Sequence, residues 1–280
     1  MLAVFYGLAS ALVWGGADFA GGLATKKNNV FTVILLSQIA GEMLVFILLP
    51  LFGEPFPAWG DVAVGGIAGL CGATGLVFFY RALARGPMGL VSPVTAVVTA
   101  GFPVLVTFLA KGLPDWYQLA GVILAIPAVW LVSQGNPEKH AMKRASFTGL
   151  LQPAFAGLLF GLFFIFIGTV SERSVLWPLA GARITSLLLM SAVIWHQHTW
   201  KPLHTGQLWL IALSGVLDMS GNAFFALAAR TGRLDIAAIL AGLGLGVTVV
   251  LARIFLKEKL YPQQRLGVVL ALGVVFLLSL

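Results

Sequence analysis

Apolar runs of about twenty residues recur along the whole chain, with little polar sequence between them. In a helical conformation, about 20 residues are needed to cross the ~30 Å hydrocarbon core of a bilayer. The runs lack the strand-like alternation of polar and apolar residues, which disfavours a β-barrel. The sequence therefore predicts an all-α integral membrane protein with ten transmembrane helices, at residues 3–24, 30–50, 61–83, 88–110, 116–134, 147–170, 177–195, 206–229, 234–256 and 261–280.

The low content of charged residues leaves no room for a soluble domain. Only 10% of the residues are charged and 59% are hydrophobic, whereas a soluble domain typically carries about 25% charged residues. The longest polar stretch is residues 135–146. We therefore interpret the net charge of +7 through membrane topology, and we expect no nucleic-acid partner. Because the first apolar run lacks a charged n-region, we expect it to remain a span and not to be cleaved as a signal peptide.

The two halves of the chain resemble each other. Adding 146 to a position in the first half places Lys111 on Lys257, Gln118 on Gln264 and Gly121 on Gly267. Each half holds five predicted helices, and an odd number turns the second copy upside down, as in transporters with inverted repeats and a midplane site. We expect two inverted five-helix repeats around a central cavity, at residues 1–134 and 147–280, joined by a loop at 135–146.

Lysine and arginine are distributed unequally between the two predicted sides of the membrane. Twelve of the 17 lie in or beside loops that follow odd-numbered helices, four follow even-numbered helices, and Arg183 lies within a span. Because cytoplasmic loops carry the excess of positive charge, the odd-numbered loops are predicted to be cytoplasmic and both termini to lie outside. The expected location is the inner, cytoplasmic membrane of a cell.

Four ionisable side chains lie deep within predicted spans. They are Asp18 in the first span, Glu42 in the second, Arg183 in the seventh and Asp218 in the eighth. Charged groups at membrane depth are costly, and they mark functional sites by default. Neighbours at helical spacing of three or four residues add aromatic or polar groups to the same faces, namely Trp14, Gln38, Ser186 and Asn222.

These buried charges have two interpretations. They form pairs inside the bundle, for example Arg183 with Glu42 or Asp218, or they bind a substrate or a proton. The repeat favours the second interpretation, because the aligned positions in the other half are uncharged: Phe160 for Asp18, Leu187 for Glu42 and Ala73 for Asp218. A charge needed only for architecture would be expected in both copies. We therefore predict a site at Asp18, where the ring of Trp14 suits a cation.

Other patterns favour packing. The pairs Gly65/Gly69 and Gly157/Gly161 have the spacing of close helix contacts, and the lone Cys71 has no disulfide partner within the chain. The histidines between the seventh and eighth predicted helices have no acidic or cysteine ligand beside them; they are His196, His198 and His204. The sequence predicts no catalytic residue, no cofactor and no metal, and it gives an enzyme little support.

Three stretches carry a family resemblance. The join of the third and fourth predicted helices reads Ala82-Leu-Ala-Arg-Gly-Pro-Met-Gly-Leu-Val-Ser-Pro93, and the join of the last two contains Lys257-Glu-Lys-Leu and Gln264-Arg-Leu-Gly267. With Trp14-Gly15 in the first helix, these stretches resemble the EamA-like, ten-helix branch of the drug/metabolite transporter superfamily. The resemblance spans essentially the whole chain, implies a secondary transporter, and places the third helix with Tyr80 at the cavity. One departure is Gly112, which stands where the second repeat has the acidic Glu258.

A further stretch, Ala17-Asp-Phe-Ala-Gly-Gly-Leu-Ala-Thr-Lys26, is similar to the first helix of the small multidrug resistance proteins. In those four-helix relatives a membrane-embedded Glu binds protons and cationic drugs in alternation, and a Lys follows at the same interval. The resemblance implies the same alternation for Asp18.

The predicted function is secondary active transport of a small polar organic metabolite, such as an amino acid, an amine or a cationic compound, by alternating access, with proton coupling and export. One alternative is uptake of choline-like quaternary ammonium compounds, held by Trp14, Tyr80 and Asp18. Another is a membrane protein that binds without transporting. The expected partners are a small-molecule substrate, protons and the lipid bilayer. The candidate substrate or proton site comprises Asp18, Trp14, Glu42, Tyr80, Arg183, Asp218 and Asn222.

Overall fold

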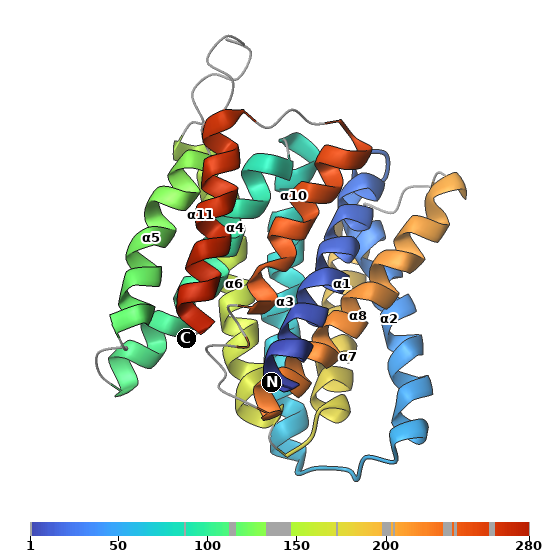
Figure 1. Cartoon of the computed structure of the whole chain (residues 1–280). Helices are drawn as coiled ribbons and strands as arrows, with labels where there is room; N and C mark the ends of the chain where they lie inside the picture. Colours follow the sequence, from blue (N-terminus) through green and yellow to red (C-terminus); the bar gives the residue numbers. More distant parts are fainter. Residues whose placement is uncertain are drawn as a thin grey trace.

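The computed structural model of the chain describes residues 2–86, 88–111, 116–132, 147–171, 173–197, 203, 205–231, 237, 240–257 and 261–279. All regular elements in these residues are helices, and the connecting loop predicted at 135–146 lies outside them. In chain order they are α1 (Leu2–Thr25), α2 (Val30–Phe52), α3 (Trp59–Arg85), α4 (Met88–Lys111), α5 (Trp116–Val132), α6 (Phe147–Ser171), α7 (Leu176–Gln197), the 3-10 helix η1 (Thr205–Gln207), α8 (Leu208–Thr231), α10 (Gly244–Phe255) and α11 (Pro262–Ser279) (Figure 1).

Six of these helices are long and apolar enough to cross a membrane, namely α1, α2, α3, α6, α7 and α8. Large apolar side chains cover their outer faces, among them Leu12, Phe46 and Leu188. A continuous apolar exterior of this kind requires lipid, because a soluble protein rarely exposes large apolar patches. The prediction of an all-helical, multi-pass membrane protein is confirmed, and the count of ten spans stays a prediction.

The ends of α2 follow from local chemistry. The side-chain oxygen of Asn29 accepts hydrogen bonds from the backbone N–H groups of Phe31 at 2.9 Å and Thr32 at 3.4 Å, which caps the helix. The helix ends at Gly53, whose φ of 58° lies in the left-handed region that glycine adopts without strain. These ends fix a helix whose buried face carries Gln38 and Glu42.

Helices far apart in the sequence lie side by side. α1 packs on α8 and α10, α6 packs on α3 and α4, α2 packs on α7 and α8, and α5 pairs with α11 at one edge of the bundle (Figure 1). Contacts between helices of the same half are sparser. The buried core therefore forms between the two halves of the chain and not within each half.

The predicted glycine contacts are confirmed. A Cβ on Gly65 or Gly69 would overlap the backbone of Pro178 or Ala182, so α3 and α7 pack backbone to backbone. A Cβ on Gly157 would lie 2.6 Å from the carbonyl oxygen of Thr95 on α4. Close approach of this kind needs small residues at the interface.

The ninth predicted span differs from the expectation of one helix over 234–256. Within its described part, the regular helix α10 begins only at Gly244, after a turn at Leu243. Leu243 donates its N–H to Leu240 and Gly246 donates to Leu243, at 3.1 and 2.8 Å, and both are bonds of the tighter three-residue type. A Cβ on Gly244 would lie 3.0 Å from the carbonyl oxygen of Ala11, so the turn lets α1 approach closely.

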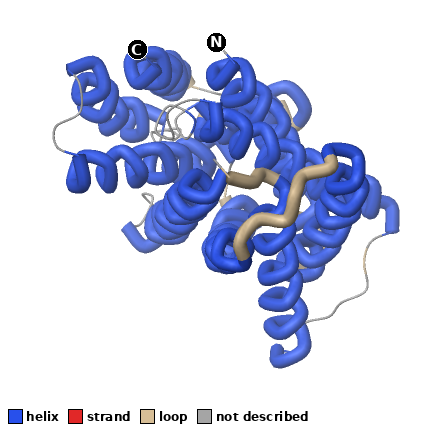
Figure 2. Tube along the Cα trace, turned by 90° about the horizontal axis from the view of Figure 1, so that it is seen from below, coloured by secondary structure: helices blue, strands red, loops and turns tan. Residues whose placement is uncertain are grey.

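The lower end of the bundle in Figure 1 is closed by polar contacts between the loop after α2 and the segment before α7. Glu54 accepts hydrogen bonds from the backbone N–H groups of Val175 at 2.8 Å and Leu176 at 2.7 Å. Arg173 donates to both oxygens of Asp61, at 3.0 and 2.6 Å. Figure 2 views this end from below, where the tan loop crosses the helix ends.

Candidate functional site

A cavity of about 90 Å³ lies inside the bundle. One water needs about 10–15 Å³ on this measure, so the cavity holds roughly six to nine waters or a small organic molecule. Asp218 stands ten residues into α8 and Arg183 seven residues into α7, which at 1.5 Å per residue places both near mid-depth of a ~30 Å core. The lining residues are Trp14, Asp18, Gln38, Gly69, Gly72, Ala73, Leu76, Thr99, Phe160, Phe163, Phe164, Leu179, Ala182, Arg183, Ser186, Asp218, Asn222, Ala241, Gly242 and Gly244.

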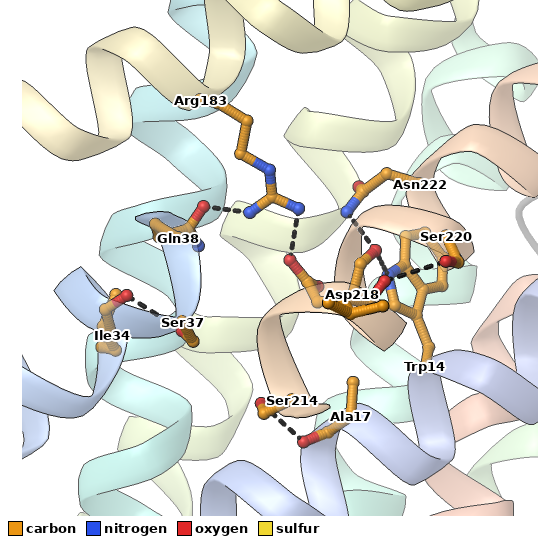
Figure 3. Close-up of polar contacts among 12 residues, drawn as sticks. Trp14, Ala17, Ile34, Ser37, Gln38, Arg183, Ser214, Asp218, Ser220 and Asn222 are labelled. Atoms are coloured by element: carbon orange, nitrogen blue, oxygen red, sulfur yellow. Dashed lines mark hydrogen bonds and ion pairs between the residues drawn. The ribbon is translucent and has the colours of Figure 1, made fainter. Parts of the chain in front are cut away.

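Arg183 is the centre of the polar lining. Its Nη2 lies 2.5 Å from Oδ2 of Asp218 on α8, and its Nη1 donates to Oε1 of Gln38 on α2 (Figure 3). The side chain of Arg183 is 7% exposed and that of Asp218 is 20% exposed. The internal pair between Arg183 and Asp218, one of the two that the sequence left open, is therefore formed.

The backbone of Asp218 is held from two directions. Nε1 of Trp14 on α1 donates to its carbonyl oxygen at 3.1 Å, and Nδ2 of Asn222 donates to the same oxygen at 2.6 Å (Figure 3). The ring of Trp14 stacks on Phe164 at a centroid distance of 5.4 Å, and Phe164 stacks on Phe225 at 4.5 Å. Trp14 therefore positions α8 while it forms part of the cavity wall.

Asp18 has a different environment from Asp218. It lines the cavity from α1, and it makes no hydrogen bond and no ion pair with any residue that the structure describes. Asp218 lines the same cavity, so the two carboxylates repel each other when both are ionised. Of the two acids in the lining, one is neutralised by Arg183 and the other has no counter-charge within the described residues.

Two predicted site residues do not belong to the lining. Tyr80 is 2% exposed, and its hydroxyl lies 3.3 Å from Oγ of Ser214, which in turn donates to the carbonyl oxygen of Ala17 at 2.9 Å. Glu42 is 5% exposed on α2, one turn beyond Gln38. The structure thus brings together Trp14, Asp18, Arg183, Asp218 and Asn222, and it places Glu42 and Tyr80 behind the wall.

Two hydroxyl groups in the lining lack hydrogen-bond partners within the described residues. They belong to Thr99 on α4 and Ser186 on α7, and both are buried. Ser186 was visible in the sequence as a polar neighbour of Arg183 at helical spacing. Thr99 was missed, because a single hydroxyl in an apolar helix has no distinguishing signal. Both groups are available to a ligand, since a hydroxyl can donate and accept.

Metal-ligand geometry is not found in the part of the chain that the structure describes. No three His, Cys, Asp or Glu side chains there come together as ligands. Of His196, His198 and His204, only His196, in the last turn of α7, lies within the described residues.

A helical bundle in lipid with a small charged cavity at mid-depth is typical of membrane transporters. The model of the EamA-like transporter family matches residues 1–134 and again residues 147–280. The chain belongs to the EamA-like transporter family, so the resemblance noted in its sequence is confirmed.

One solved structure supports the fold. It carries only the description "Crystal structure of protein" and superimposes with a TM-score of 0.74, at 16% sequence identity, over 98% of this chain and 95% of that chain. Similarity at this identity speaks for the fold alone. No curated protein matches the sequence.

Proposed function

We propose that this protein is a secondary active transporter that moves a small organic compound with a positively charged group, such as an amine, an amino acid or another cationic metabolite. One observation carries the proposal. Asp18 lines the cavity without a hydrogen bond or ion pair among the described residues, whereas Asp218 is paired with Arg183. A buried carboxylate needs a counter-charge, and a substrate cation or a proton supplies it.

The charges of the described lining residues support the same substrate class. Among these residues two carboxylates, of Asp18 and Asp218, face one guanidinium, of Arg183, so they carry one excess negative charge when ionised. The unpartnered hydroxyls of Thr99 and Ser186 offer hydrogen bonds to the polar part of a ligand. A compound with an ammonium group and a second polar group complements both features.

We further propose that residues 1–134 and 147–280 are inverted five-helix repeats joined by residues 135–146. The family model matches each half separately. In the proposed repeats α6 is the counterpart of α1, α8 of α3, and α10 of α4. The contact of α1 with α8 then corresponds to the contact of α6 with α3, and the contact of α1 with α10 corresponds to that of α6 with α4. All four contacts occur. Gln38 and Arg183 are 145 residues apart, which makes them equivalent positions of the two proposed repeats. They form a hydrogen bond with each other, as side chains beside a two-fold axis do. The counterparts α5 and α11 run in opposite directions (Figure 1).

In the proposed cycle the two repeats expose the cavity alternately to each side of the membrane. Asp18 takes up a proton on one side and a substrate cation on the other, which couples the two fluxes. The resemblance of the stretch from Ala17 to Lys26 to small multidrug resistance proteins supports this exchange, and it favours export. Each of these acids is present in only one of the two repeats. This asymmetry supports a role for the acids in binding a substrate or a proton.

A second candidate is uptake of choline-like quaternary ammonium compounds. The aromatic wall formed by Trp14, Phe160, Phe163 and Phe164 favours it, because aromatic faces attract such cations. Tyr80 does not line the cavity, so these rings, and not Tyr80, would form the cage with Asp18.

We propose that the protein lies in the cytoplasmic membrane with its odd-numbered loops in the cytoplasm, as the distribution of lysine and arginine favours. Single cysteines introduced at Lys27 and Phe56, in a background with Cys71→Ser, test the orientation. A membrane-impermeant thiol reagent applied to intact cells is expected to label the cysteine at position 56 and not that at position 27. Labelling at position 27 alone would reverse the orientation.

The substrate class is tested by thermal unfolding of the purified protein with amines, amino acids and quaternary ammonium compounds. A ligand at 100 times its Kd stabilises the folded state by about 2.7 kcal/mol. We expect cationic ligands to raise the Tm of the wild-type protein and of Asp18→Glu. In Asp18→Asn the rise should vanish while the Tm without ligand stays close to wild type, because Asp18 forms no hydrogen bond or ion pair with the described residues that this change would remove. Equal stabilisation of Asp18→Asn and wild type would refute the role of Asp18.

Proteoliposomes then separate a transporter from a protein that only binds. A ligand found by thermal unfolding is loaded inside, and a proton gradient is imposed across the membrane. We expect gradient-driven flux with wild type and none with Asp18→Asn. Binding without flux in the wild-type protein would favour the non-transporting alternative.

A further inference from the structure

A third acid inside the bundle lies beside the cavity without lining it. Glu42 is 5% exposed, and neither of its carboxylate oxygens has a hydrogen-bond partner in the part of the chain that the structure describes. An ionised carboxylate without a partner is among the most costly groups to bury. Burial without a partner therefore favours the neutral, protonated form of Glu42 in this conformation.

Arg183 lies against the part of α2 that carries Glu42. Gln38, which accepts a hydrogen bond from Arg183, lies one helical turn before Glu42 and on the same face of α2. Gly41 also faces the guanidinium, since a Cβ at that position would lie 3.5 Å from Cζ of Arg183. The guanidinium therefore lies next to the stretch of α2 that carries Glu42, and it is bonded to Asp218 and not to Glu42.

Among the described residues, the surroundings of Glu42 offer no other cation. α2 packs against α1, α3, α7 and α8, and among their described residues at this depth Arg183 is the only Lys or Arg. The other titratable groups of these helices at this depth are Asp18, Cys71, Tyr80 and Asp218. Asp18 and Asp218 face the cavity, and Tyr80 bonds to Ser214.

We propose that Arg183 is a switch that pairs with either Asp218 or Glu42, and that Glu42 releases a proton when Arg183 moves to it. This deepens the proposed function and rests on it, because the switch controls how many carboxylates a substrate cation meets. With Glu42 protonated, Arg183 neutralises Asp218, and the cavity offers Asp18 alone. With Glu42 ionised, Arg183 pairs with it, and Asp218 joins Asp18 in the cavity.

The step balances in charge and in atoms. The O–H bond of Glu42 breaks and its proton passes to water, while the ion pair of Arg183 with Asp218 is replaced by one with Glu42. A substrate cation bound to Asp18 then takes the place of Arg183 beside Asp218. One cation has entered for one proton released, so the net charge of the cluster of Glu42, Arg183, Asp218 and substrate is unchanged.

Infrared spectroscopy of the full protein in lipid tests the switch without a ligand. Protonated buried carboxyl groups give a C=O stretching band, and the part lost in Glu42→Gln belongs to Glu42. In Asp218→Asn, Arg183 has lost its carboxylate, so we expect it to move to Glu42 and the Glu42 band to disappear although Glu42 is unchanged. Asp218→Ser gives the same expectation should Asp218→Asn not fold.

The matched control is Asp61→Asn, which removes a carboxylate from the other ion pair, that with Arg173 at the end of the bundle. The Glu42 band should remain in this variant. Absence of a Glu42 band in the wild-type protein, or its persistence in Asp218→Asn and Asp218→Ser, would overturn the switch.

Failure of the switch and failure of the proposed function give different results. Binding of methylammonium is measured by thermal shift across pH in Glu42→Gln and Asp18→Asn. We expect Glu42→Gln to bind, with one proton fewer released per cation, and Asp18→Asn not to bind. Loss of the Glu42 band in Asp218→Asn, together with methylammonium binding that survives Asp18→Asn, would support the switch and overturn the role of Asp18.

Discussion

The guanidinium of Arg183 and the carboxylate of Asp218 form a buried ion pair with 2.5 Å between Nη2 and Oδ2. The pair joins α7 to α8, and the bond from Arg183 to Gln38 adds α2. Removing one partner of a buried pair typically costs about 3–5 kcal/mol, because the other charge is left without compensation. The same two residues therefore hold three helices together and set the charge of the cavity.

The first prediction is that substitutions of Asp218 and Glu42 have non-additive effects on the free energy of unfolding. Asp218→Asn alone is expected to cost less than the 3–5 kcal/mol of a broken buried pair, because Arg183 can move to Glu42. Glu42→Gln alone should be close to neutral, since Glu42 makes no hydrogen bond within the described residues. The double variant leaves Arg183 without a carboxylate and should lose the full amount. Free energies of unfolding in detergent complete the cycle, and additive effects would contradict the coupling.

A second prediction concerns the contact of α3 with α7. A Cβ on Gly69 would overlap the backbone carbonyl of Ala182, so Gly69→Ala must push the helices apart. Overpacking of this kind costs about 1–3 kcal/mol. Gly60 on the same helix is the control, because nothing lies within 4 Å of a Cβ there. Thermal unfolding should show a lower Tm for Gly69→Ala and no loss for Gly60→Ala, and equal Tm values would contradict the packing argument.

The closed end of the bundle gives a third prediction. Glu54 caps α7 by accepting from the N–H groups of Val175 and Leu176, and loss of a cap costs about 0.5–2 kcal/mol. Hydrogen exchange at these two amides should accelerate roughly tenfold in Glu54→Ala, because 1.4 kcal/mol corresponds to a factor of ten.

The Arg173–Asp61 pair at the same end supplies the comparison. The side chain of Arg173 is 63% exposed, and an exposed ion pair contributes about 0–1 kcal/mol. Arg173→Ala should therefore change the exchange of Val175 and Leu176 less than Glu54→Ala does. A larger effect of Arg173→Ala would show that the ion pair, and not the cap, closes this end.

A fourth prediction contrasts two serines of similar burial. Ser186 has a buried hydroxyl without a partner among the described residues, so Ser186→Ala should leave the stability unchanged or raise it slightly. Ser214 donates to Ala17 and bonds to Tyr80, so Ser214→Ala should cost about 1 kcal/mol. Ligand binding should be weakened more by Ser186→Ala than by Ser214→Ala, because only Ser186 of these two serines lines the cavity. A destabilising Ser186→Ala would indicate that its hydroxyl has a structural partner.

Much of the fold could be predicted because membrane spans are local features. The bounds of α1, α2 and α7 fall within two residues of the predicted segments, since length and hydropathy decide where a helix can cross lipid. The ninth span was less predictable. Its turn at Leu243 depends on the close approach of Gly244 to Ala11, a contact between opposite ends of the chain.

The membership of the site was predicted in part for a related reason. Any charge in an apolar run is conspicuous, so Asp18, Glu42, Arg183 and Asp218 could be identified from the sequence. The hydroxyl of Thr99 could not be identified, because serine and threonine in membrane helices commonly bond to a carbonyl of their own helix, as Thr74 does to Leu70 at 2.7 Å. Only the contacts between helices distinguish a satisfied hydroxyl from a free one.

By itself, the sequence determined that the chain is a helical membrane protein with acids and one arginine at membrane depth, because hydropathy is a property of each segment. The tertiary structure decided that Arg183 pairs with Asp218, that Asp18 faces the cavity without a partner among the described residues, and that Glu42 and Tyr80 stand behind its wall. These outcomes depend on how each helix is rotated and where it crosses its neighbours, and packing between residues far apart in the chain sets both.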